Sequence, residues 1–96
     1  MTVLWTATAQ QNRDTIYRYL AHETGRDTVS KRVDAVIESS ANLLIDYPLA
    51  GREGRIAGTR ELLTQRFPYM LVYRVTEGRV IILRVLHQSQ RPPKRL

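Results

Sequence analysis

The sequence predicts an α+β fold of the order β-α-α-β-β-β, in which a helical hairpin packs on one face of a small antiparallel sheet. Apolar residues recur at helical spacing in the first half of the chain, and after a stretch with three glycines the apolar period changes to two. The chain has 96 residues, the size of one domain, so we expect residues 1–96 to fold as a single unit.

The first expected elements are a short strand and a helix. Thr2–Ala7 is rich in β-branched and aromatic residues, which favours a strand. Thr8 and Gln11 have the spacing of a capping box, and a helix is expected from there to about His22. Asn12 and Arg13 interrupt the apolar stripe of this helix.

A second helix is expected after the break at Thr24-Gly25. Asp27 or Thr28 is its expected N-cap, and Tyr47-Pro48 ends it because the residue before a proline is pushed out of the α region. The apolar face of this helix is about five turns long. Its residues are Val29, Val33, Val36, Ile37, Ser40 and Leu44.

The second half of the chain predicts a loop and three strands. Pro48–Gly58 is expected to be irregular. Strands are expected at Arg60–Phe67, Tyr69–Val75 and Val80–Leu86, with a tight turn at Glu77-Gly78 between the last two.

The segment Gln88–Leu96 is expected to form a short basic tail. Its Pro92-Pro93 pair prevents further helix or strand pairing.

Composition excludes several classes of function. The absence of cysteine removes disulfides, thiolate metal sites and cysteine nucleophiles, and two histidines do not suggest a histidine-rich metal site. We therefore expect no cofactor. The N-terminus lacks the pattern of a secretory signal, and no apolar stretch approaches the roughly 20 residues that span a bilayer. The expected location is the cytoplasm, without a membrane partner.

Arginine dominates the charge of the second half. Residues 1–50 hold five bases and six acids, whereas residues 51–96 hold ten bases and three acids, and the whole chain carries a net +6. Thirteen of the 15 bases are arginine, which favours bidentate contacts with carboxylate or phosphate. Three interpretations stay open: a nucleic-acid or ribosome surface, a docking surface for an acidic protein, or a solvated face with no specific partner.

Two arginines lie within apolar strands. We expect Arg74 and Arg84 to share the side of the sheet without helices, as a shallow basic face with an apolar floor. The alternative is that each arginine packs its stem and extends its charged end into water. Strict alternation groups Ile81, Leu83, Val85 and His87 on one face of the last strand. The residues expected to ring the basic face are Arg52, Arg55, Arg60 and Arg66.

His87 is the candidate imidazole acid or base of this surface. Ser89 is a weak candidate nucleophile. Arginines stabilise the charge that develops when a ribose 2′-hydroxyl attacks its phosphate, so RNA cleavage is chemically conceivable. The alternative is that His87 simply bonds to backbone or solvent at the end of its strand.

Three segments carry a resemblance to a known family. They are Gly58–Leu62 (GTREL), Tyr69–Val75 (YMLVYRV) and Ile82–Ser89 (ILRVLHQS). Together with the helical hairpin they make the whole chain resemble the RelE/ParE superfamily of bacterial toxins, the stable halves of type II toxin–antitoxin (plasmid stabilisation) modules. The fold of that superfamily agrees with the order predicted above.

The resemblance implies one of two targets. RelE-type members are ribosome-dependent mRNA endonucleases, and this alternative implies a catalytic set of Arg60, Arg74, Arg84 and His87. ParE-type members poison DNA gyrase and are not known as enzymes. Whether the chain is an enzyme therefore depends on the target.

Several positions depart from the RelE pattern and favour the ParE type. RelE-type nucleases usually carry lysines where this chain has Glu61 and Leu63, and an arginine where Met70 follows Tyr69. RelE-type nucleases also use a tyrosine near the C-terminus or a denser set of histidines, and no tyrosine follows Tyr73 in this chain. The His-Gln-Ser ending, by contrast, resembles ParE-type chains.

The resemblance also implies a partner, a small acidic antitoxin that forms a hetero-oligomer with the toxin. An acidic segment gains charge-assisted hydrogen bonds and apolar burial when it folds onto a basic groove. The residues expected to bind antitoxin or target are Arg52, Arg55, Arg60, Arg74, Arg84 and His87. A plain RNA-binding module is a third possibility, but the strands offer no evident platform of aromatic residues for stacking.

Overall fold

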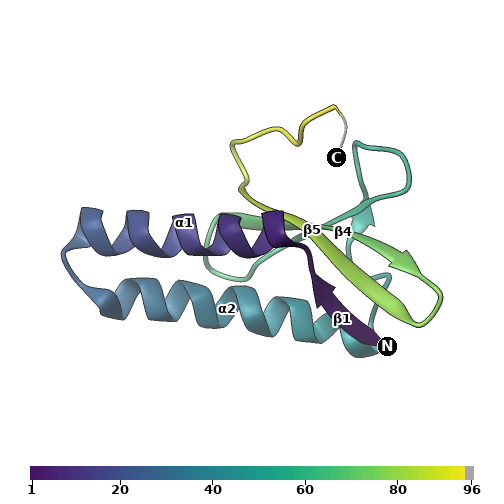
Figure 1. The fold of residues 1–96 in the computed structure, drawn as a ribbon, viewed down its shortest axis with the longest axis horizontal. Coiled ribbons are helices and arrows are strands. Elements are labelled where there is room, and N and C mark those ends of the chain that lie inside the picture. The colour runs from purple at the N-terminus through teal and green to yellow at the C-terminus, as the bar shows by residue number, and fades with distance from the viewer. Residues whose placement is uncertain (95–96) are drawn as a thin grey trace.

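The computed structural model describes residues 1–94. Two helices lie side by side on one face of a five-stranded sheet (Figure 1), which confirms the predicted α+β class and the helical hairpin. The last two residues of the predicted tail Gln88–Leu96 lie outside the described residues. The elements in order are β1 (Thr2–Trp5), α1 (Ala7–Thr24), α2 (Asp27–Asp46), β2 (Arg52–Glu53), β3 (Arg60–Leu63), β4 (Tyr69–Thr76) and β5 (Arg79–His87).

The sheet has the strand order β1-β5-β4-β3-β2 and is mixed, not antiparallel throughout. β1 runs parallel to β5, with Thr2 beside Arg79 and Trp5 beside Ile82, and Figure 1 shows the two strands side by side. The antiparallel prediction is therefore wrong for β1. Between β1 and β5 the chain passes through the two helices and three more strands, and such a long connection allows the first and last strands to run in the same direction.

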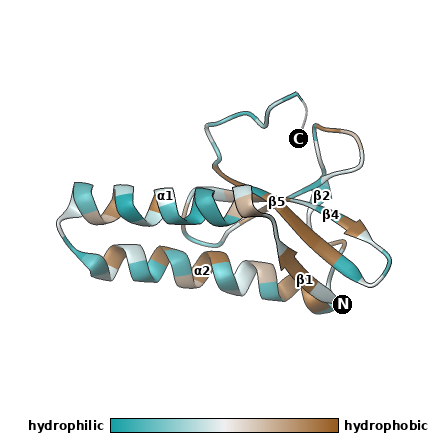
Figure 2. Cartoon of the chain, viewed as in Figure 1, coloured by the Kyte–Doolittle hydropathy of each residue, from teal (hydrophilic) through white to brown (hydrophobic). Residues whose placement is uncertain are grey.

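The core lies between the helices and the facing side of the sheet. Figure 2 shows β1 and β5 as mainly apolar, whereas the tail after β5 is mainly hydrophilic. Burial of these apolar side chains is the main stabilising contribution, at about 25 cal/mol per Å² removed from water. The fully buried core residues include Ala9, Ile37, Ala41, Leu44, Leu71, Tyr73, Val80 and Ile82.

The ends of α1 are set by short polar contacts. Thr6 is the N-cap, and its hydroxyl accepts a hydrogen bond from the amide of Ala9 at 3.1 Å. The predicted cap at Thr8 is therefore wrong, because the helix already begins at Ala7. Gly25 ends α1 in the left-handed conformation at φ 65°, as its place after the apolar stripe predicts.

α2 begins without a side-chain cap. Its N-cap is Arg26, so the predicted caps Asp27 and Thr28 lie inside the helix instead. Asp27 still stabilises the first turn of α2, because its carboxylate lies near the positive end of the helix dipole. α2 ends at Asp46, with Tyr47 as its C-cap before Pro48, as predicted. Neither helix of residues 1–94 has the length and apolarity needed to cross a membrane.

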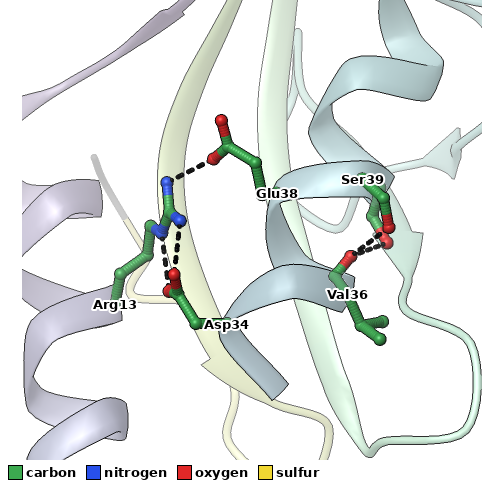
Figure 3. Close-up of polar contacts among 6 residues, drawn as sticks. Arg13, Asp34, Val36, Glu38 and Ser39 are labelled. Atoms are coloured by element: carbon green, nitrogen blue, oxygen red, sulfur yellow. Dashed lines mark hydrogen bonds and ion pairs between the residues drawn. The ribbon is translucent and has the colours of Figure 1, made fainter. Parts of the chain in front are cut away.

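Arg13 joins the two helices at the point where the apolar stripe of α1 is interrupted. Its guanidinium donates to Asp34 at 3.1 and 3.0 Å and to Glu38 at 2.7 Å (Figure 3). It also lies over the ring of Trp5, 4.4 Å from the centroid. Burial alone would lower the pKa of Arg13, but its hydrogen bonds to the two carboxylates outweigh this, and the pKa is raised. An ion pair thus replaces apolar packing here.

Candidate functional site

The side of the sheet away from the helices carries a row of directly opposed residues that crosses four strands. Arg52 of β2 pairs with Glu61, Glu61 with Val72, and Val72 with Arg84. Opposed residues share a face of a sheet, so this row lies on one side. Arg74 lies two residues after Val72 on β4 and belongs to the same side. We call the exposed part of this side the basic face, defined by Arg52, Arg55, Arg74, Arg79 and Arg84.

A β-bulge places Arg84 on the basic face. Tyr73 pairs with Ile82, but the preceding residue Val72 pairs with Arg84, so Leu83 is an extra residue in β5. The predicted grouping of Val85 and His87 with Ile81 is therefore wrong, because alternation restarts after the bulge. Arg74 and Arg84 share the helix-free side as predicted, but strict alternation from the turn would have separated them.

Glu61 is the buried anchor of the basic face. Its side chain is 1% exposed and accepts from the guanidinium groups of Arg52 at 3.1 Å and Arg55 at 3.2 Å, and from the backbone amide of Arg55 at 3.0 Å. Burial alone would raise the pKa of Glu61. The hydrogen bonds from Arg55 and Arg52 outweigh it, so the pKa is lowered and the carboxylate stays charged.

The apolar floor predicted for this face is closed. Met70 and Val72 are fully buried, and the Arg55 guanidinium lies 3.8 Å from the sulfur of Met70. Met70 and Val72 are therefore not open to a partner, which meets arginine side chains above them. Arg74 is exposed and Arg84 half-buried, and the ion pairs among residues 1–94 involve neither.

Arg60 and Arg66 do not ring the basic face. Arg60 pairs with Tyr73 on the helix side of the sheet, and its guanidinium donates to the carbonyl of Gly51 at 2.8 Å. The Tyr73 hydroxyl donates to Pro48 and accepts from the Gly51 amide, and burial raises its pKa. Arg66 sits in a turn at φ 70° beside α2.

His87 also lies on the helix side. It pairs with Tyr69, and the two rings meet edge to face with centroids 5.6 Å apart. Its Nδ1 accepts from the backbone amide of Ser89 at 3.1 Å and lies 2.7 Å from the Ser89 hydroxyl. The four candidate catalytic residues are thus divided between two faces, with Arg74 and Arg84 on one and Arg60 and His87 on the other.

Sequence reasoning missed Arg79. It pairs with Thr76, on the same side of the sheet as Arg74, and is exposed. The two-residue turn at Glu77-Gly78 could have located Arg79. Counting strand pairs from this turn sets Arg79 opposite Thr76, which is two residues from Arg74 on the same face.

A groove lies at the open edge of β3, between α2 and β3. This groove of about 480 Å³ is lined by apolar residues, Val36, Leu43, Leu62 and Leu63, and by polar ones, Ser39, Ser40, Gln65 and Arg66. The chain after α2 extends it, with Tyr47 62% and Leu49 63% exposed. β2 pairs only with the first two residues of β3, so Leu62 and Leu63 lie on a stretch of β3 that β2 leaves open. We call this surface the α2–β3 groove.

Comparison with known proteins assigns the family. A family model described as the ParE toxin of type II toxin–antitoxin systems, parDE, matches residues 3–92. The chain belongs to the ParE toxin family. This confirms the resemblance to the RelE/ParE superfamily and identifies the chain as the toxin component of a type II toxin–antitoxin system.

A curated relative and two solved structures resemble this ParE-family chain. The relative, "Putative toxin Y4kP" of Sinorhizobium fredii (strain NBRC 101917 / NGR234), is 37% identical over 92 residues, which cover 96% of this chain and 93% of the relative. The chromosomal ParDE system of P. aeruginosa contains a chain with a TM-score of 0.81 and 26% identity, with 91% of this chain and 95% of that one covered. The RelBE2 toxin–antitoxin complex of Mycobacterium tuberculosis contains one with a TM-score of 0.65 and 28% identity, with 90% and 95% covered.

Proposed function

We propose that this protein inhibits growth by poisoning DNA gyrase, and that a cognate acidic antitoxin neutralises it within a hetero-oligomer. The observation that carries the gyrase target is the division of Arg60, Arg74, Arg84 and His87 between two faces of the sheet. Membership of the ParE family supports the same target.

Cleavage of RNA at one phosphate needs its base and its charge-stabilising groups around a single point, because a proton is transferred only over hydrogen-bond distance. The sheet itself separates His87 from Arg84. The Nδ1 atom of His87 is also already engaged by Ser89. This division disfavours a ribonuclease centre built from these four residues and supports a toxin that acts by binding, and we assign target contact to the exposed Arg74 and the half-buried Arg84.

The antitoxin is proposed to cover the α2–β3 groove. The groove and the chain that extends it expose Leu43, Tyr47, Leu49 and Leu63, and neighbouring exposed apolar side chains mark interaction sites in soluble proteins. The open edge of β3 offers backbone hydrogen bonds to an added strand. The net charge of +6 attracts an acidic chain, and type II systems supply such a partner. The structurally similar chains come from the P. aeruginosa ParDE system and the M. tuberculosis RelBE2 complex, both toxin–antitoxin pairs.

The alternative function is ribosome-dependent mRNA cleavage. One observation favours it: Arg74, Arg79 and Arg84 form a basic face of the kind that binds a phosphate backbone. Under this alternative Arg84 is required for cleavage, whereas under the gyrase proposal His87 is dispensable.

The deciding experiment pairs two assays on the purified toxin. Gyrase supercoiling and DNA-cleavage reactions are run beside an in vitro translation reaction in which mRNA ends are mapped. We expect gyrase inhibition with trapped cleavage complexes and no new mRNA ends. New mRNA ends with normal supercoiling would replace the gyrase proposal by the ribonuclease alternative.

The partner is tested separately in cells. Expression of the toxin alone is expected to stop growth, and co-expression with the neighbouring acidic gene product is expected to restore it. Normal growth during expression of soluble toxin would contradict the proposal as a whole.

A further inference from the structure

A pocket of about 440 Å³ lies between α1, the end of β5 and the turn that follows it. It is separate from both the basic face and the α2–β3 groove. Its aromatic walls come from Tyr19, Tyr69 and His87, and Ile16 adds an apolar contact. The pocket lining, within residues 1–94, contains no carboxylate, lysine or arginine, so its preference for a ligand depends on its neutral polar groups.

Two side-chain amides line this pocket in a fixed orientation. The Oδ1 atom of Asn12 accepts from the amide of Val85 at 3.0 Å, and the Oε1 atom of Gln90 accepts from the amide of His87 at 2.8 Å. A backbone N–H is only a donor, so the oxygen of each side-chain amide must face β5. Each amide therefore keeps its NH₂ group for a ligand.

The imidazole of His87 also has its acceptor nitrogen bonded within the chain and its donor nitrogen left for a ligand. Its Nδ1 accepts from the backbone N–H of Ser89 at 3.1 Å, so Nδ1 carries no proton. In the neutral ring the proton is then on Nε2. Asn12, Gln90 and His87 thus have their acceptor atoms used within the chain and their donor atoms left over.

The geometry points to a binding site for a carboxylate carried on a flat apolar body. The carboxylate oxygens accept hydrogen bonds from Asn12, Gln90 and the Nε2–H of His87, and bonds to an ionised acceptor are stronger than neutral ones. The rings of Tyr19 and Tyr69 contact the apolar body. A ligand with N–H groups in place of the carboxylate finds no free acceptor on these three side chains, because their acceptor atoms already bond to backbone amides. The source is either a free aromatic acid or the chain end of a partner peptide.

Benzoate and benzamide test this chemistry on the full chain, because they have the same shape and differ in charge. Binding is followed by the backbone amide NMR signals of His87, Ser89 and Gln90. We expect benzoate to shift these signals saturably with a Kd of about 1 mM, as for a ligand of this size, and benzamide to bind at least about tenfold more weakly. No saturable shift with benzoate, or equal shifts with benzamide, would overturn the proposal.

Two variants test the donors without removing the structural hydrogen bonds. Asn12→Asp and Gln90→Glu each keep the oxygen that accepts from β5 and replace the NH₂ group by a second oxygen. Each is expected to weaken benzoate binding at least about tenfold. Gln11→Glu adds the same charge on an exposed position of α1 and is the control. Unchanged benzoate binding in both variants would refute the assignment, and Gln90→Glu remains informative if Asn12→Asp fails to fold, because Gln90 lies in an exposed turn.

A short peptide with a C-terminal phenylalanine distinguishes the two sources. Its free-acid form is compared with its amidated form and with benzoate. Tighter binding of the free-acid peptide than of benzoate assigns the pocket to the chain end of a partner, and tighter binding of benzoate assigns it to a small acid. Equal binding of the acid and amide peptides would contradict recognition of a carboxylate.

Discussion

Arg74 and Arg84 lie on the same face of the sheet because one extra residue in β5 separates the pairs Val72–Arg84 and Tyr73–Ile82. In a regular hairpin Arg84 would instead lie opposite Leu71, on the side that packs against the helices. The bulge therefore assigns the charge of Arg84 to the side where it reaches solvent, and Val85 to the core.

Charge reversal of this pair separates target binding from antitoxin binding. In the double variant Arg74→Glu/Arg84→Glu we expect the protein level needed for growth inhibition to rise on the order of tenfold or more, because the attraction to the target becomes repulsion. Antitoxin binding, measured by co-purification, is expected to persist. The control Arg18→Glu/Arg32→Glu makes the same charge change on the exposed faces of the helices. Equal toxicity of the two double variants would contradict a role for the basic face.

Leu63 tests the α2–β3 groove. We expect Leu63→Asp to weaken antitoxin binding by about 2 kcal/mol, since it introduces a charge into the proposed apolar contact. Leu4→Asp is the control, because Leu4 is exposed to a similar degree, 42% against 49%, but lies on β1 at the other edge of the sheet. The two affinities are compared by calorimetry with the purified antitoxin. The groove would be the wrong site if Leu4→Asp weakened binding and Leu63→Asp did not.

Glu61 makes stability depend on acid pH. Its pKa is lowered in the folded protein, so it contributes stability above its ordinary value of 4.5, and this contribution is lost as the pH falls through the folded value. We expect Glu61→Gln to reduce the free energy of unfolding at pH 7 by about 1–3 kcal/mol. The difference from the wild-type protein is expected to shrink toward pH 3, as measured by urea unfolding. A difference that stayed constant with pH would show that the charge of Glu61 is not responsible.

Arg13 is expected to contribute more to the free energy of unfolding than an arginine in an exposed ion pair. Arg13→Ala removes contacts to Asp34, Glu38 and Trp5, and the Arg13 side chain is only 13% exposed, so we expect a loss of about 1–2 kcal/mol. Arg18→Ala, which breaks only the exposed pair with Asp14, is expected to cost under about 0.5 kcal/mol. Thermal unfolding of both variants gives the comparison. Equal losses would show that the contacts of Arg13 stabilise the fold no more than the exposed pair of Arg18 does.

The helices and the antiparallel strands β3, β4 and β5 could be predicted because their signals are local, whereas the short strand β2 lies in the stretch Pro48–Gly58 that was expected to be irregular. The apolar spacing of α2 and the stop at Gly25 depend only on neighbouring residues, and both were predicted. The direction of β1 was not, because it depends on which strand it meets about 80 residues later.

The candidate site was less predictable for the same reason. Whether Arg84 faces the helices depends on a bulge for which the run of apolar residues in β5 gives no signal. Arg60 looked like a surface arginine, but the carbonyl of Gly51, brought near by the loop after α2, holds it on the helix side. Glu61 was noted only as a departure from the RelE pattern, although it anchors Arg52 and Arg55.

The parallel pairing of β1 with β5 has a consequence for synthesis. Residues 2–5 are made long before residues 79–82, with which they pair. Until residues 79–82 have been made, the first strand has no neighbouring strand and the sheet stays incomplete. A chain truncated before β5 therefore lacks the strand that lies between β1 and β4, and its first strand cannot join the sheet.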